Sequence, residues 1–134
     1  MNGTFLVLGA IFTGIAALIH LAIFVLESVL WSRPAVWKRF GVRSQEDADV
    51  MRPMAYNQGF YNVFLALGAG IGIIMIGSEG VQEAGIALAI FALLSMLLAS
   101  IVLVASNPRL LRAAMVQGLA PLLGIVFLVL ALLG

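Results

Sequence analysis

Four long apolar stretches, separated by polar segments, run along the chain at about residues 4–30, 54–76, 81–105 and 110–133. Each is close to or above the roughly 20 residues that a helix needs to cross a bilayer. An isolated strand cannot satisfy its backbone hydrogen bonds in lipid, so each stretch predicts a helix. We therefore expect an all-α fold: an integral membrane four-helix transmembrane bundle, forming a single domain over residues 1–134.

The segments between the stretches predict two tight turns and one long loop. The turn signals are Gly77-Ser78-Glu79-Gly80 and Ser106-Asn107-Pro108. In the loop, residues 31–53, apolar side chains alternate with basic ones over residues 36–40. This pattern fits a short amphipathic helix whose aromatic side chains dip toward lipid, or an ordinary anchored loop. Ser44, followed by acidic residues, indicates the start of a further helix that leads into the second span.

Charge distribution predicts how the bundle is oriented. All seven Lys and Arg residues lie in residues 31–53 and 106–112, whereas the other turn carries Glu79 and, just after it, Glu83. The positive-inside rule places the basic segments in the cytoplasm and both termini outside. Only 10% of residues are charged and 63% are hydrophobic, too few charges for a soluble surface. We expect a multi-pass protein of the bacterial inner (plasma) membrane, with the lipid bilayer as its main partner.

Composition also excludes several kinds of chemistry. The chain has no cysteine, so disulfides, thiol catalysis and Cys-ligated metals are excluded. One histidine and one nearby glutamate fall short of a usual metal-ligand set, and the few basic residues do not resemble a nucleic-acid surface. We expect no metal, no cofactor and no nucleic-acid partner. The N-terminal stretch lacks a basic segment and is too long for a signal-peptide core, so it predicts a retained first span.

Ionisable side chains inside a span are costly and mark candidate sites. The first span contains His20 and Glu27, which share a helix face with Trp31. His20 and Glu27 are about 10 Å apart along the axis, so something else must lie between them. The interpretations without a site are a satisfied buried histidine, and an ion pair of Glu27 with Arg33 or Arg52.

A second polar group opens the next span, where residues 56–62 read YNQGFYN. Counting turns from the basic edge places Glu27 level with Asn57 and Gln58, and places Tyr61, Asn62 and Gln117 one turn deeper. Ser100 is in the same half. Together these residues predict a polar pocket between the helices, although Asn62 and Ser100 alone could serve as interhelical contacts. Gly68 and Gly72 are typical of close helix packing.

The segments IHLAIFVLESVLW and NQGFYNVFLALG are similar to a family of small bacterial and fungal membrane proteins called domain of unknown function 1304. The resemblance covers nearly the whole chain, and a Pro follows the last Gln slightly later here, at Pro121. It implies the same architecture but no substrate. The residues that carry it are His20, Glu27, Trp31, Asn57, Gln58, Gly59, Tyr61, Asn62 and Gln117.

Three functions fit the polar residues. The first is binding or transport of a small solute, with or without proton coupling, in which case we expect a homodimer. The second is an enzyme that isomerises a lipophilic metabolite or opens its epoxide, with His20 and Glu27 as catalytic acid and base. The third is a structural membrane subunit without activity. The first is favoured, and the ligand-binding residues would be Glu27, His20, Asn57, Gln58, Tyr61, Asn62, Gln117 and Trp31.

Overall fold

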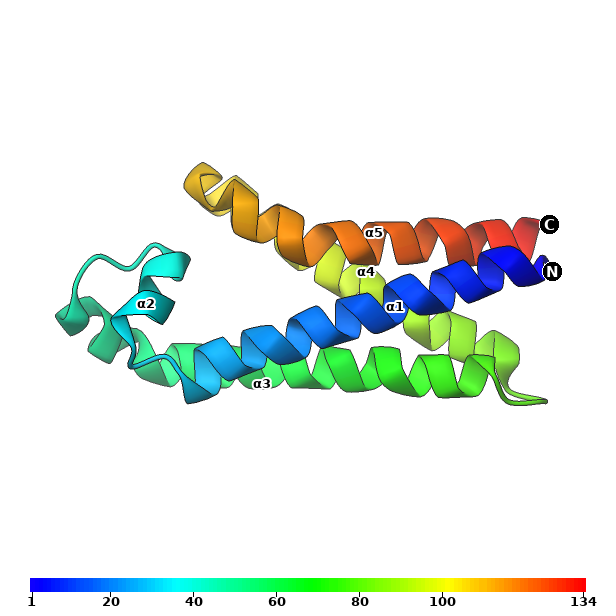
Figure 1. Ribbon diagram of the computed structural model, residues 1–134, viewed down its shortest axis with the longest axis horizontal. Helices are drawn as coiled ribbons and strands as arrows, with labels where there is room; N and C mark the ends of the chain where they lie inside the picture. The colour runs from blue at the N-terminus through cyan, green and yellow to red at the C-terminus, as the bar shows by residue number, and fades with distance from the viewer.

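The computed structural model describes residues 1–134 and contains helices and no strands (Figure 1). Four helices are long and apolar enough to cross a membrane, which confirms the predicted fold class. The elements are α1 (Gly3–Phe24) continued by the π-helical turn η1 (Val25–Val29), α2 (Pro34–Trp37), the 3₁₀ turn η2 (Lys38–Phe40), α3 (Gln45–Ile76), α4 (Gln82–Ser106), the 3₁₀ turn η3 (Pro108–Leu110) and α5 (Leu111–Leu133).

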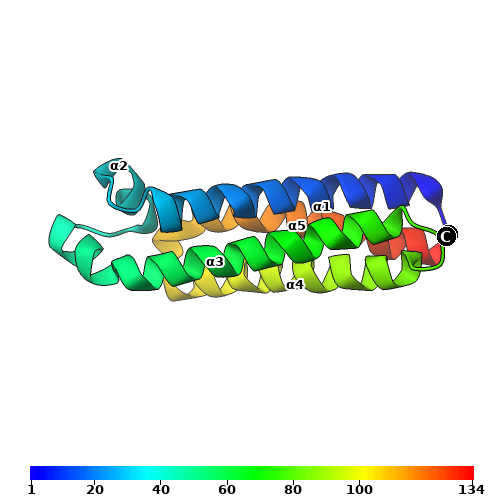
Figure 2. The same cartoon turned by 90° about the horizontal axis from the view of Figure 1, so that it is seen from below.

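The long helices form a closed ring in which α1 and α4 each pack against both α3 and α5. Both chain termini and the α3–α4 turn lie at one end of the bundle, which we call the termini end (Figures 1 and 2). The opposite end carries α2 and the α4–α5 turn, and we call it the loop end. All seven basic residues are in the loop-end segments, as the sequence predicts.

Small side chains fill the centre of the bundle. Ala16, Ala69 and Ala89 have no exposed surface, and Gly72 and Gly85 are buried beside them. A Cβ atom on Gly72 would lie 2.9 Å from the backbone nitrogen of Ala89, and one on Gly85 would lie 2.6 Å from that of Ile76. The backbones of α3 and α4 therefore approach as closely as glycine allows, and the predicted packing role of Gly72 is confirmed.

A second, smaller core lies at the loop end. It consists of Trp31, Trp37, Val42, Ala48 and Ala55, and the indole N–H of Trp31 donates to the Ala48 carbonyl at 2.8 Å. The amphipathic helix is therefore formed, as α2 and η2, and the interpretation as an ordinary loop is wrong. Its aromatic side chain at Trp37 is only 4% exposed and packs against protein, so the expectation that it dips toward lipid is also wrong.

The helix predicted after Ser44 is continuous with the second span. The Ser44 hydroxyl accepts from the Asp47 backbone N–H at 3.0 Å, which is the expected N-cap. From Gln45 the helix runs without interruption through Pro53 to Ile76. It therefore extends well beyond the span expected from Met54, and its first turns belong to the loop-end core.

Replacing a glycine of α3 by alanine adds one methyl group, and it tests whether that glycine is in tight contact with α4 or is only buried. We expect Gly72→Ala to lower the free energy of unfolding by about 1–3 kcal/mol, because the new Cβ would press on the α4 backbone. Gly70→Ala is the matched control: a Cβ there meets nothing within 4 Å, so the higher helix propensity of alanine should leave stability unchanged or raise it by up to about 1 kcal/mol. Unfolding in mixed micelles measures both, and equal effects would contradict the packing role.

Candidate functional site

The centre of the site is a hydrogen bond between two buried side chains on different helices. Asn62 Nδ2 of α3 donates to Glu27 Oε2 in η1 at 2.9 Å, and each residue is 8% exposed. The same amide nitrogen also donates to the Gln58 carbonyl at 3.1 Å, which fixes the orientation of the Asn62 side chain. No other hydrogen bond in the structure joins side chains of two different helices.

The backbone around Glu27 allows this contact. The Leu30 N–H donates to the Val25 carbonyl at 2.9 Å, five residues back, so the helix widens into a π turn at this point. The neighbouring Ser28 hydroxyl donates to the Tyr56 carbonyl of α3 at 2.9 Å. A Cβ on Gly59 would clash with that hydroxyl and lie 3.2 Å from Glu27 Cβ, so a glycine is needed there. The sequence carries no recognisable signal for the π turn. Because Ser28 lies in this turn, its contact with α3 was not predicted.

Glu27 has no basic partner. Its hydrogen-bond partner is the neutral amide of Asn62, while Arg33 and Arg52 are exposed, so the ion pair considered from the sequence does not form. Removing a carboxylate from water costs several kcal/mol unless a counter-charge or several hydrogen bonds compensate. One amide is an incomplete compensation, so the chain itself does not balance the charge of a Glu27 carboxylate.

His20 lies deeper in the bundle and is 2% exposed. Its Nδ1 is 2.9 Å from the Ala16 carbonyl, and since a carbonyl only accepts, Nδ1 carries a hydrogen. This bond leaves Nε2 as the ring atom without a partner in the chain. His20 and Glu27 do not bond to each other, as their spacing predicts.

The YNQGFYN residues divide between two faces of α3. Gln58 is one turn from Asn62 and about 40° around the helix, so it flanks the Glu27–Asn62 pair from an exposed position. Asn57 and Tyr61 are also exposed but lie about 140° and 100° from Asn62. The Tyr61 ring packs edge-on against Phe64, at 6.5 Å between centroids. The structure thus places Asn57 and Tyr61 outside this pair.

The predicted depths of these residues need one correction. Glu27 pairs with Asn62, one turn deeper than the predicted level of Asn57 and Gln58. The predicted depths start from the ends of the apolar stretches, but α3 begins at Gln45, and the bond between Glu27 and Asn62 shows which residues are level. The large side chain of Trp31, also a candidate, instead belongs to the loop-end core through its bond to Ala48.

Gln117 of α5 lies at about the same level in the bundle as His20. Gly124 lies against Thr13 of α1, and two turns from there toward the loop end bring α1 to His20 and α5 to Gln117. Gln117 is half-buried, and Pro121 deprives its carbonyl of the usual helical donor. The Ser100 hydroxyl, in contrast, donates to the Leu97 carbonyl of its own helix at 2.7 Å and makes no interhelical bond.

The helices are not evenly spaced at the loop end. Figure 1 shows α4 and α5 diverging from α1 and α3 toward the loop end, and α5 bends along its length. Pro121 is the residue in α5 that can cause such a bend. His20, Glu27 and Asn62 therefore belong to one helix pair, while Gln117 belongs to the other.

Comparison with known proteins matches most of the chain to one family. The family model described as "Protein of unknown function (DUF1304)" matches residues 14–129. The chain belongs to this family. The matched region includes α1 from Gly14 onward, η1 and all the candidate residues, so the predicted resemblance is confirmed. No curated protein and no solved structure matches the chain.

Asn62 and Asn57 give a matched test of the interhelical bond. Asn62→Ala removes the donor to Glu27, so we expect a loss of about 1–2 kcal/mol in the free energy of unfolding. Asn57→Ala removes an exposed amide of the same helix and should change stability by less than about 0.5 kcal/mol. In the Glu27→Ala background the cost of Asn62→Ala should shrink, because the acceptor is already gone. Additive effects would show that the two side chains are not coupled.

Proposed function

We propose that this membrane protein binds a small solute at Glu27, and that the solute supplies the positive charge or the hydrogen bonds that the chain does not. The observation that carries the proposal is the buried Glu27 carboxylate, held by one neutral amide within a membrane-spanning helix. Asn62 occupies Oε2 and leaves Oε1 for the solute. Gln58 flanks the pair with a further amide, so a cation with N–H groups suits the site best.

Transport, with proton exchange at Glu27, is the activity we favour for this site. A single intramembrane carboxyl group can hold either a proton or a cation, and such exchange couples the two movements. The divergence of α4 and α5 from α1 and α3 toward the loop end, and the proline in α5, support a bundle that can open on the loop side. A homodimer would provide a wider pathway than four helices enclose.

An enzyme is the second candidate, because of the arrangement of His20. Its Nδ1–H is held by a backbone carbonyl, which is how histidines that act as bases are often oriented, and Nε2 is left to accept a proton. Such a base, with Glu27 as the acid, could isomerise a lipophilic metabolite or open an epoxide. The third candidate, a structural subunit, requires no ligand at all.

Ligand-dependent thermal stability distinguishes these functions. We expect benzylammonium, a cation with N–H groups, to raise the melting temperature of the purified protein, and the apparent affinity to fall at least tenfold in Glu27→Gln. Gln can still accept the bond from Asn62, so this variant removes the charge and should keep the fold. Glu79→Gln, in the exposed α3–α4 turn, is the matched control and should bind as the wild type does.

Other results of this experiment would favour the enzyme or the structural subunit instead. If a lipophilic epoxide stabilises the protein instead, and is consumed by the wild type but not by His20→Ala, the enzyme replaces the transporter. If no compound acts and Glu27→Gln is indistinguishable from the wild type, the structural role is correct and Glu27 is not a binding residue.

We also propose that the loop end is cytoplasmic, as the basic residues predict. The chain has no cysteine, so single substitutions at exposed positions report orientation directly. We expect a membrane-impermeant maleimide to label Glu79→Cys on intact spheroplasts, and Arg43→Cys only after permeabilisation. The reverse pattern would place the termini inside the cell.

A further inference from the structure

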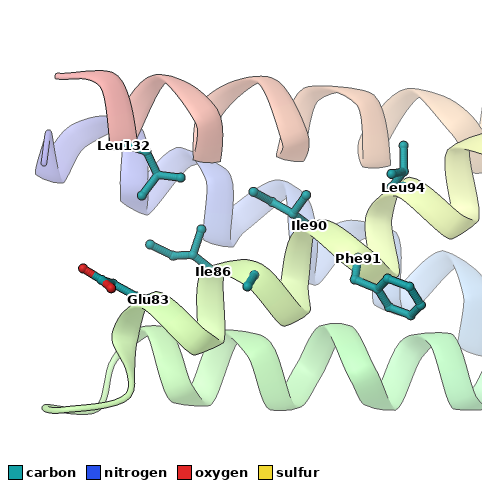
Figure 3. A pocket seen from close by; sticks show the side chains of 7 residues that line it. Glu83, Ile86, Ile90, Phe91, Leu94 and Leu132 are labelled. Carbon is teal, nitrogen blue, oxygen red and sulfur yellow. The ribbon is translucent and has the colours of Figure 1, made fainter.

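An open apolar groove runs along the outward surface of α4 near the termini end (Figure 3). Its volume is about 510 Å³, and six of its seven lining residues are hydrophobic. α4 provides most of the wall, and Leu132 of α5 closes one side. The α4 residues are Glu83, Ile86, Ala87, Ile90, Phe91 and Leu94.

The dimensions of the groove suit one alkyl chain from one leaflet. From Glu83 to Leu94 the helix rises by about 16 Å at 1.5 Å per residue. This is about half of the ~30 Å hydrocarbon core of a bilayer. The groove lies on a lipid-facing surface and is apolar over this length, so hydrocarbon rather than water occupies it in a membrane.

Glu83 is the one charged residue of the lining, and it stands at the end of the groove beside the α3–α4 turn (Figure 3). Its side chain is exposed. No lysine or arginine lies at the termini end, because all seven are in residues 31–53 and 106–112. With no basic side chain nearby, this carboxylate is available to pair with a positive head group.

From this combination we infer that the groove binds an amphiphile with a single alkyl chain and an ammonium head. The chain lies along Ala87, Ile90 and Leu94, and the ammonium group pairs with Glu83. The site is separate from Glu27, which sits near the opposite end of the bundle and faces α3. The inference about the groove is therefore independent of the proposed function of Glu27.

A series of amphiphiles that differ only in the head group tests this inference. Native mass spectrometry of the full chain, released from a nonionic detergent, can measure binding of dodecylammonium, dodecanol and dodecyl sulfate. We expect dodecylammonium to bind at least tenfold more tightly than dodecanol, and dodecyl sulfate to bind least. Equal affinities would overturn the inference.

Two variants assign the binding to the groove. Glu83→Gln should abolish the preference for the ammonium head and leave dodecanol binding unchanged, whereas Glu79→Gln, outside the lining, should keep the preference. Ala87→Trp fills the groove from an exposed position, so it should reduce binding of both compounds while the protein stays folded. A preference that survives Glu83→Gln, or binding that survives Ala87→Trp, would place the amphiphile elsewhere. All of these affinities are measured in the Glu27→Gln background, so that the proposed solute site cannot contribute to the preference.

Discussion

Close backbone contact between helices is the interaction on which the rest of this structure depends. Lipid tails are as apolar as leucine, so burying a leucine between two membrane helices gains little, and tight packing must hold them together. The chain meets this requirement with alanine and glycine: Gly72 against Ala89, and Gly85 against Ile76. The large side chains can then face outward, where Phe64 and Phe91 are more than half exposed.

The candidate site also depends on a glycine that lets two helix backbones approach closely. Gly59 lets the π turn of the first span approach α3 until Ser28 reaches a backbone carbonyl and Glu27 reaches Asn62. At Gly72 and Gly85 the close contact only holds two helices together. At Gly59 it also brings a carboxyl group next to a neutral amide within the membrane-spanning segments. The packing itself gives no reason for a carboxyl group at this position, since glutamine could accept the same bond. This is the basis on which we propose a functional role for Glu27.

The two ends of the bundle present different chemistry. The loop end has the basic residues, a small tryptophan core and the spreading of the two helix pairs, with Glu27 just inside it. The termini end has two glutamates and an apolar groove on α4. A protein with such sided chemistry is suited to separate interactions at the two membrane surfaces, and the proposed solute site and amphiphile groove correspond to them.

The sequence alone determined the four helices, the turns and the N-cap at Ser44, because each depends on local physics: the length of apolar segments and the side chains at helix ends. It also identified His20, Glu27 and Asn62, since polar groups stand out in apolar helices. It did not determine which of these residues meet. The pairing of Glu27 with Asn62, the outward position of Asn57 and Tyr61, and the structural use of Trp31 were decided by helix rotation and by the relative heights of the helices. Those depend on contacts between residues distant in the chain, such as Ser28 with Gly59, and on a π turn that no local pattern announces.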